Sequence, residues 1–222
     1  IKTNTISLFG LLAILVALYF TYSYASWLAI LIGLFVWLIL SKRWLYVFLL
    51  ALAPVIITVT QWSTYKFQQM FDLIGRSSSH VRLQIWQTTK LMIKENFVTG
   101  IGLGRFQDKY LSFAERLFHP PLELLVLHAH NVFLHFWVNI GLFGTAGFML
   151  LLVRWLLRVG RAVKTPEAIA IISTMIALLS HGMLDNAYWK NDLSALFWLI
   201  IGLGILASNQ QQKSQSYVQN RD

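Results

Sequence analysis

The fold of this chain is decided by residues 130–153, HNVFLHFWVNIGLFGTAGFMLLLV. Residues 131–153 form an apolar run without charged side chains, and about 20 such residues cross the hydrocarbon core of a bilayer as a helix. His128 and His130 stand immediately before this run, at the boundary between water and lipid. A water-soluble group and a lipid-anchored group can meet there. The stretch therefore predicts a transmembrane helix that begins beside polar, reactive side chains.

The rest of the 222-residue chain has the composition of a membrane protein. It is 57% hydrophobic and only 12% charged, whereas soluble domains carry about 25% charged residues. Further apolar runs occur at about 5–22, 24–40, 44–61, 167–183 and 189–207. We therefore predict an all-α polytopic membrane protein with about six transmembrane helices. Pro54 is expected to kink the third, and the short last run needs interfacial residues such as Trp189 to reach across.

The charge of the short connections predicts the orientation in the membrane. The basic residues of these connections are Lys2, Lys42, Arg43, Arg154, Arg158, Arg161 and Lys164. With six spans they share one side, which we assign to the cytoplasm. The tail 208–222 falls on the same side and is predicted to be disordered, because it has little apolar surface to bury. Since basic residues occupy gaps between apolar runs, the net charge of +9 does not indicate a nucleic-acid partner.

Residues 62–130 are then extracytoplasmic. They hold eight basic and five acidic residues, and a loop longer than about 60 residues is exempt from the charge rule. Connections of this length are usually functional. The predicted organisation is three transmembrane helices in 1–61, a partly helical extracytoplasmic loop in 62–130, three transmembrane helices in 131–207 and the tail. The chain has no cysteine, which excludes disulfides and thiolate zinc sites.

A helix is predicted inside the loop, from its cap at Ser79 to about Glu95. Arg82 falls within the apolar arc of this helix, between Trp86 and Thr89. A guanidinium that faces lipid or protein core is costly unless it finds an anion. Arg82 therefore either reaches to lipid headgroups or a carbonyl, or it clamps a diphosphate with its planar, bidentate donors.

A glycine-rich turn follows at residues 100–105, GIGLGR. The turn lacks the lysine and the βαβ context of nucleotide-binding loops, which excludes that class of site. Its backbone N–H groups and Arg105 can approach an anion. Alternatively, it is a tight turn that leads into a short helix.

Polar residues recur along the fourth apolar run. His128, Asn131, His135 and Asn139 are spaced by three, four and four residues, and such a stripe in lipid usually makes hydrogen bonds between helices. His130 lies off the stripe, at or before the helix start, where substrate can reach it. An accessible histidine is a natural general base near neutral pH.

An acidic residue stands near the end of the fifth run. His181 and Asp185 share a face if that helix continues so far. Asp185 can then orient a histidine, bind a sugar hydroxyl or form a plain interfacial pair. The sequence has no Asp-x-Asp pair and no HExxH motif, so the usual divalent-metal sites are absent. Arginines would have to neutralise any diphosphate leaving group.

From Arg82 to about Gly204 the chain resembles the C-terminal, catalytic half of the bacterial O-antigen ligase and polymerase superfamily. The matching pieces are RLQIW at 82–86, the turn at 100–106, the spacing H-N-x9-G-x-x-G from His130 to Gly144, and His181–Asp185. Family members usually have more spans. The chain, which lacks a start methionine, is therefore expected to begin inside a longer protein.

The resemblance implies a glycosyltransferase of the bacterial inner membrane, multi-pass, with its active site on the extracytoplasmic face. It would move a glycan, with inversion, from a polyprenyl-diphosphate carrier to a glycan, lipid A-core or protein acceptor. No cofactor is implied, and the missing acidic pair predicts metal independence. His130 would be the catalytic base. The substrate-binding residues would be Arg76, Arg82, Arg105, Asn131 and Asp185.

Other interpretations stay open from sequence. Ligase, polymerase and protein O-oligosaccharyltransferase share these motifs. A transport protein for carrier lipid or ions would use the same basic loop and polar stripe without glycosyl chemistry. A metal site built from His128, His130, His181 and Asp185 is a third possibility.

Overall fold

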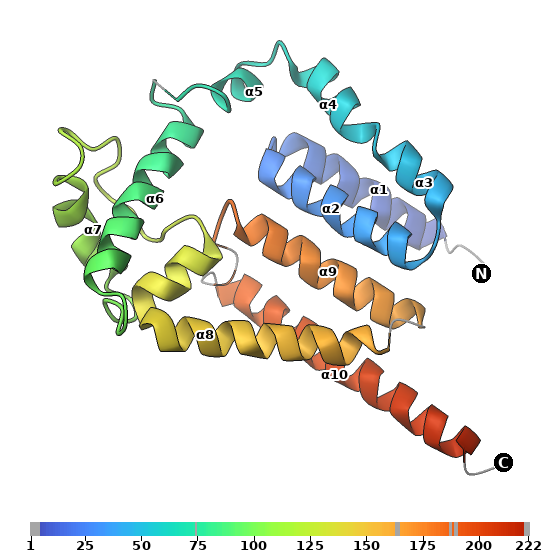
Figure 1. Ribbon diagram of the computed structural model, residues 1–222. Coiled ribbons are helices and arrows are strands. Elements are labelled where there is room, and N and C mark those ends of the chain that lie inside the picture. Colours follow the sequence, from blue (N-terminus) through green and yellow to red (C-terminus); the bar gives the residue numbers. More distant parts are fainter. Residues whose placement is uncertain (1–4, 74, 163–164, 187, 189–190, 220–222) are drawn as a thin grey trace.

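The computed structural model describes residues 5–73, 75–162, 165–186, 188 and 191–219. All ten regular elements in these ranges are helices, which confirms the predicted all-α class. Lys2, Lys164 and Trp189, on which the predicted orientation and span length partly rest, lie outside the described residues. Figure 1 shows a bundle of long helices, with two loop helices at one end of it.

The bundle is centred on α9, Pro166–Gly182, which packs against α2, Tyr24–Leu40. A Cβ atom on Gly33 would lie 2.8 Å from the Cβ of Ala177, so the glycine lets the two helices approach closely. A short turn joins α2 to the preceding helix α1, Thr5–Phe20. Both helices match the first two predicted apolar runs.

The third predicted run is divided into α3, Trp44–Leu50, and α4, Ala53–Gln61. Pro54 lies in the first turn of α4, where its missing N–H costs nothing because no partner would be available. The expected kink is therefore a break between two helices.

Length and composition mark three helical segments as able to cross a membrane: Trp44–Gln61, Val132–Gly160 and Leu193–Gln211. Shorter apolar helices cover Leu8–Phe20, Tyr24–Leu40 and Pro166–Gly182. The coarse prediction of a polytopic helical chain agrees with this set. The count of six spans stays a prediction, because it depends on the three shorter helices.

The loop contains α5, Tyr65–Gln69, α6, Ser78–Glu95, and α7, Phe106–Ala114. The expected cap at Ser79 is wrong by two residues. Ser77 has extended backbone angles, and its hydroxyl accepts a hydrogen bond from the N–H of His80 at 3.0 Å. The structure therefore starts α6 two residues earlier than a cap at Ser79 predicts.

The loop helices share a core with the start of α8. This core includes the fully buried side chains of Ile85, Met92, Phe106, Tyr110 and Val138. Burial raises the pKa of the Tyr110 hydroxyl. Because α6 and α8 contribute to one core, the loop is fixed to the bundle rather than extended away from it.

Helix α8, Val132–Gly160, is kinked at Gly141, whose φ of 65° is left-handed. The turn at residues 97–102 occupies the kink. Ile101 N donates to Val138 O at 2.7 Å and Gly102 N to Asn139 O at 3.1 Å, so the loop replaces bonds that the helix itself lacks. A Cβ on Gly141 would lie 2.1 Å from Val98 O, and one on Gly100 would lie 2.6 Å from Gly141 N. These two glycines allow backbone to pack directly on backbone.

The second half of α8 packs with α9 and α10, Asn191–Gln219, around a separate core. Trp155 Nε1 donates to Ile201 O at 2.9 Å across the α8–α10 contact. Residues 208–219 continue α10 as helix, where the sequence predicted disorder. Glutamine and lysine favour helix, and this segment extends an existing helix, which avoids the cost of nucleation.

Candidate functional site

A cleft of about 280 Å³ lies where the start of α6 faces the residues before α8. Its lining consists of Arg76, Ser77, Ser78, Val81, Arg82, Glu123 and His130. Two of the three arginines predicted to bind diphosphate therefore line one cavity with the predicted base. The lining residues come from two parts of the 62–130 loop, residues 76–82 at the start of α6 and residues 123–130 before α8.

The two arginines of the cleft differ in their partners. Arg82 is half-buried, and its buried Nε has no hydrogen-bond partner within the described ranges. Buried polar groups are nearly always hydrogen-bonded, so this guanidinium lacks an acceptor. Arg76 is 70% exposed and forms an ion pair with Glu123, with Nη2 to Oε1 at 3.1 Å. The first turn of α6 also faces the cleft, and its free N–H groups favour an anion.

His130 is held in an unusual backbone conformation. Its φ of 47° is left-handed, which is uncommon for a residue with a side chain. Trp86 Nε1 of α6 donates to the His130 carbonyl at 3.4 Å. This contact ties the backbone of the candidate base to the helix that carries Arg82.

Asn131 is the N-cap of α8. Its Oδ1 accepts hydrogen bonds from Phe133 N and Leu134 N, both at 3.0 Å, and its Nδ2 donates to Met183 O at 2.9 Å. Both ends of the amide thus bind backbone, and the residue is buried. Contact between Asn131 and substrate stays a prediction.

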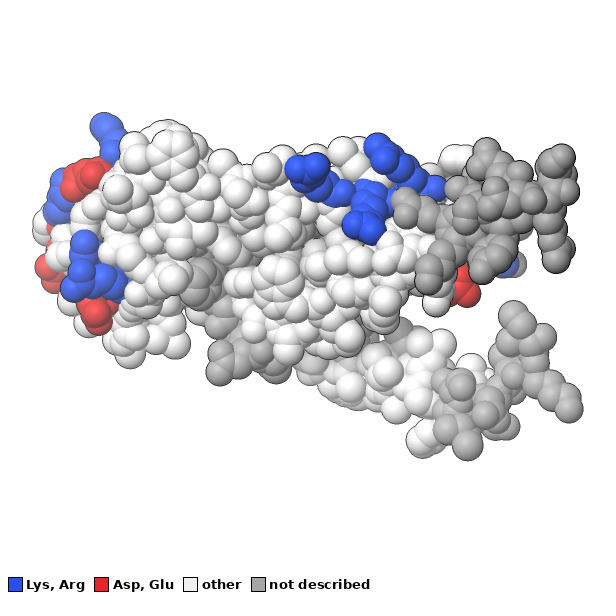
Figure 2. Space-filling model, turned by 90° about the horizontal axis from the view of Figure 1, so that it is seen from below, with Lys and Arg blue, Asp and Glu red and all other residues white. Residues whose placement is uncertain are grey.

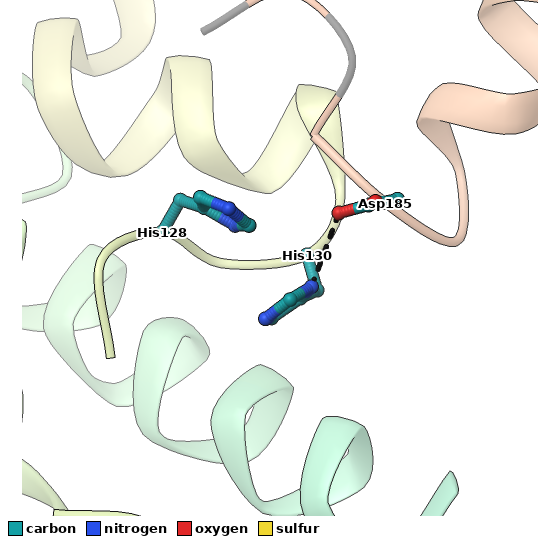
Figure 3. Close-up of side chains that lie close together, drawn as sticks. All are labelled: His128, His130 and Asp185. Atoms are coloured by element: carbon teal, nitrogen blue, oxygen red, sulfur yellow. Dashed lines mark hydrogen bonds and ion pairs between the residues drawn. The ribbon is translucent and has the colours of Figure 1, made fainter. Parts of the chain in front are cut away.

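Asp185 lies close to His130, although 55 residues separate them in the chain. The Oδ1 of Asp185 is 3.1 Å from Nδ1 of His130, and Figure 3 shows the two side chains directed toward one another. A carboxylate can only accept hydrogen bonds, so His130 carries its proton on Nδ1. In the neutral imidazole the lone pair is then on the other ring nitrogen, Nε2, which points away from Asp185 (Figure 3).

Asp185 reaches this position because α9 ends at Gly182. The sequence predicted that His181 and Asp185 share a helix face if the helix continues to Asp185. Instead, Asp185 lies in the turn after the helix, with its N–H bonded to His181 O at 3.0 Å. Its carboxylate also accepts the N–H of Asn186 at 2.7 Å. The turn therefore orients the carboxylate toward His130.

His128 contacts the same pair. Its ring centroid lies 4.4 Å from that of His130, and Figure 3 shows the ring beside the His130–Asp185 bond. One ligand atom each from His128, His130 and Asp185 lie within 4.8 Å of one another. These are three of the four residues of the metal interpretation, and imidazole and carboxylate suit a divalent transition metal.

The remaining polar residues of the stripe bind backbone. Asn139 Nδ2 donates to His135 O at 2.7 Å within α8, and His135 Nδ1 accepts the N–H of Ala129 at 3.3 Å. These bonds lie within α8 and the segment before it, whereas Asn131 of the same stripe makes a bond between helices, to Met183 O at the end of α9. They hold residues 129–131 against the start of the helix.

Arg105 lies apart from the cleft lining. It is exposed, and it forms the N-cap position of α7 beyond the turn that fills the α8 kink. The structure therefore assigns the glycine-rich turn a packing role against α8. Arg105 as a diphosphate ligand stays a prediction.

Two residues near the cleft were not predicted from sequence. Glu123 pairs with Arg76, and Trp86 binds the His130 carbonyl. Glu123 lies in an irregular segment without periodicity, so no pattern marks it. The sequence does point to Trp86, because its indole N–H lies on the same arc as Arg82 and needs a hydrogen-bond acceptor when it is buried.

Comparison with known proteins gives one family. A family model described as O-antigen ligase matches residues 9–149. No curated protein matches the chain. The matched range includes Arg76, Arg82, His130 and the Gly141 kink, and it ends before Asp185. Because the match covers more than half of the chain, this protein belongs to the O-antigen ligase family.

Proposed function

We propose that this chain transfers a glycan from a polyprenyl-diphosphate carrier to an acceptor hydroxyl at the extracytoplasmic face of the bacterial inner membrane. Family membership supports the coarser statement, a glycosyl-transferring membrane protein of polysaccharide synthesis. The finer proposal rests on one observation: the His130–Asp185 pair opens onto the cleft that Arg76 and Arg82 line.

The diphosphate of the donor binds between the arginines and the start of α6. Arg82 supplies a planar fork whose Nε lacks an acceptor, and planar guanidinium groups match phosphate oxygens in pairs. The first-turn N–H groups of α6 add donors from the backbone. Arg76 turns from Glu123 to the second phosphate, which its exposure permits.

His130 activates the acceptor. The Nε2 lone pair takes the proton of the acceptor hydroxyl while its oxygen attacks the anomeric carbon. The bond between that carbon and the diphosphate oxygen breaks, and the polyprenyl diphosphate leaves with the electron pair. Attack opposite the leaving group inverts the anomeric configuration. Negative charge grows on the diphosphate as the bond breaks, so the arginines stabilise the transition state more than the ground state.

Asp185 and Asn131 act as positioning residues. Asp185 holds the His130 proton on Nδ1 and stabilises the imidazolium that forms. The aspartate of a Ser-His-Asp hydrolase triad has the same role toward its histidine. Asn131 joins the start of α8 to the end of α9 through Met183 O. Together, Asp185 and Asn131 keep the side chains of His130 and Asp185 in contact, although these two residues lie next to different helices.

The proposal is tested by separating binding from chemistry. His130→Ala removes the base and leaves both arginines in place. General-base assistance contributes about 10²–10⁴-fold, so single-turnover transfer should fall by that factor while donor binding is retained. The measurement is made in nanodiscs with lipid-linked donor, and a matched control is His119→Ala, an exposed histidine of the same loop. Near-normal turnover in His130→Ala would remove the catalytic assignment.

The cluster of His128, His130 and Asp185 requires a second experiment. If these residues hold a catalytic metal, a chelator abolishes transfer and a divalent cation restores it. We expect the rate to be unchanged by chelation, because His130 Nδ1 is already bonded to Asp185. Chromatography of the glycolipid pool after incubation distinguishes transfer from transport, since a transporter moves the donor without changing its glycan.

A further inference from the structure

A second cavity lies at the other end of α8, between the last turns of α8 and the middle of α10. Its volume is about 910 Å³. Among the described residues, three arginines line it, Arg154, Arg158 and Arg161, and the six other lining side chains are all apolar. We infer that this α8–α10 groove binds an anionic phospholipid, with the phosphate on the arginines and an acyl chain along the apolar wall. The inference does not depend on the proposed function.

The arginines form one face of α8. Their spacings of four and three residues place them on neighbouring turns. Arg158 donates to Ser208 Oγ at 3.1 Å and to Asn209 Oδ1 at 2.7 Å, which fixes it to α10. Arg154 and Arg161 are exposed and have no hydrogen bond or ion pair to the described parts of the chain. The described part of the chain thus leaves two cations available to an external anion.

Among the residues that the structure describes, no acidic side chain lines the groove. Figure 2 shows Lys and Arg side chains gathered on one uncharged stretch of the surface, with mixed charges at the other end of the molecule and an acidic side chain farther along at the same end. A patch of one sign, with no counter-charge among its lining residues, favours a negatively charged ligand.

The apolar wall selects an amphiphile rather than a free anion. Leu157, Trp198 and Ile205 line the groove beside the arginines, and Trp198 is about half exposed. Inorganic phosphate would leave this wall in water, whereas an acyl chain would cover it. Basic pockets between membrane helices bind anionic headgroups in this manner.

The position along α8 places the lipid in one leaflet. Helix α8 has 29 residues and counts among the segments able to cross the membrane, and 24 residues separate His130 from Arg154. At about 1.5 Å per residue, a straight helix of this length is comparable to the roughly 30 Å hydrocarbon core, and the kink at Gly141 shortens it. In the predicted topology, with Arg154, Arg158 and Arg161 on the cytoplasmic side and the 62–130 loop on the other, the groove faces the leaflet opposite the His130 cleft.

The test measures lipid binding directly. The protein in detergent is titrated with phosphatidylglycerol or phosphatidylcholine, and native mass spectrometry counts bound lipid. The variant Arg154→Gln/Arg161→Gln removes the two free cations and retains the Arg158 bonds to α10. At about 1 kcal/mol per basic residue, the dissociation constant for phosphatidylglycerol should rise roughly 30-fold. Phosphatidylcholine should bind weakly to both proteins.

A matched control removes two exposed cations on the same predicted side of the membrane, as Lys42→Gln/Arg43→Gln. The control should bind phosphatidylglycerol as the unmodified protein does, and Arg154→Lys/Arg161→Lys should retain most of the affinity. Equal binding by the glutamine variant, or an equal loss in the control, would overturn the inference. Displacement of the lipid by millimolar inorganic phosphate would also overturn it, because the site would then be one for free anions.

Discussion

Arginines gather at both ends of α8, in different surroundings. Before the helix, Arg76 and Arg82 share a polar cleft with His130 and an acidic residue, Glu123. At its end, Arg154, Arg158 and Arg161 border apolar side chains, and the described part of the chain contributes no acid and no histidine to the groove lining. The cleft therefore combines positive charge with a base, whereas the groove offers charge alone. A cluster of arginines indicates an anionic ligand at both sites. The neighbouring side chains determine whether the site can also catalyse a reaction on that ligand or can only bind it.

The cleft and the groove are also formed by different numbers of structural elements. The cleft needs the loop, the start of α8 and the turn after α9 to meet. The groove needs only α8 and α10, which share with α9 a core whose described residues include none from the 62–130 loop. Function in the cleft should therefore be much more sensitive to changes in backbone geometry than binding in the groove. The following variants test this difference.

The largest effect is expected from Gly141→Ala. A left-handed alanine costs about 1–2 kcal/mol, and overpacking adds roughly 1–3 kcal/mol, because its Cβ would overlap Val98 O. The loop should detach from α8, with a lower melting temperature and no donor binding. Phosphatidylglycerol binding in the groove should change less than threefold, a bound we set from the separate cores.

The matched control is Gly147→Ala, also in α8. No heavy atom lies within 4 Å of a Cβ at Gly147, and alanine favours a helix interior by about 1 kcal/mol over glycine. This variant should melt at the same or a higher temperature. If both variants behave alike, close backbone packing at Gly141 is not what holds the loop.

A smaller effect is expected from Asp185→Asn. The amide keeps the shape of the side chain but not the charge that stabilises imidazolium. Hydrogen bonds to charged groups contribute about 1.5–3 kcal/mol, so kcat should fall roughly 10- to 100-fold with the KM for donor unchanged. Asp108→Asn, an exposed acid of α7, serves as the control. A change in KM without a change in kcat would make Asp185 a substrate ligand instead of a positioning residue.

The smallest effects separate charge from shape. In the cleft, Arg82→Lys keeps the charge and loses the planar fork, so donor affinity and rate should both fall by about tenfold, the loss of one good hydrogen bond. In the groove, Arg154→Lys should change phosphatidylglycerol affinity by less than about threefold, because either cation attracts a headgroup. Equal sensitivity at the two positions would remove the distinction between clamp and charge patch. Unchanged donor binding in Arg82→Lys would favour the other interpretation, in which Arg82 reaches to lipid headgroups.

Much of the architecture could be predicted from the sequence because its signals are local. Apolar runs predicted the positions of most long helices, and Pro54 predicted an interruption where α3 gives way to α4. The position of Arg82 on the apolar arc of α6 predicted a cation in need of an anion. The structure places this residue in the same cleft as His130.

The remaining features depend on contacts between distant residues. Asp185 pairs with His130 because α9 stops at Gly182, and helix ends are weakly encoded. Gln84 of α6 is buried although it is polar, and its Oε1 accepts the N–H of Leu122, 38 residues away, at 3.0 Å. The contact between Gly100 and Gly141 joins two distant segments. In the sequence, Gly100 has the features of an ordinary turn residue and Gly141 those of an ordinary helix residue. No periodicity within either segment reports such a contact.

The α8 kink also constrains how the protein enters the membrane. Val138 O and Asn139 O receive their hydrogen bonds from Ile101 and Gly102, which precede them in the chain. Without these donors, two carbonyl groups of a membrane helix would face lipid unpaired, at several kcal/mol each. During synthesis the turn leaves the ribosome before α8 does, so the donors are already made when the helix inserts. The order of segments in the gene thus matches the order in which insertion can be completed, and moving the loop behind α8 by circular permutation would reverse it.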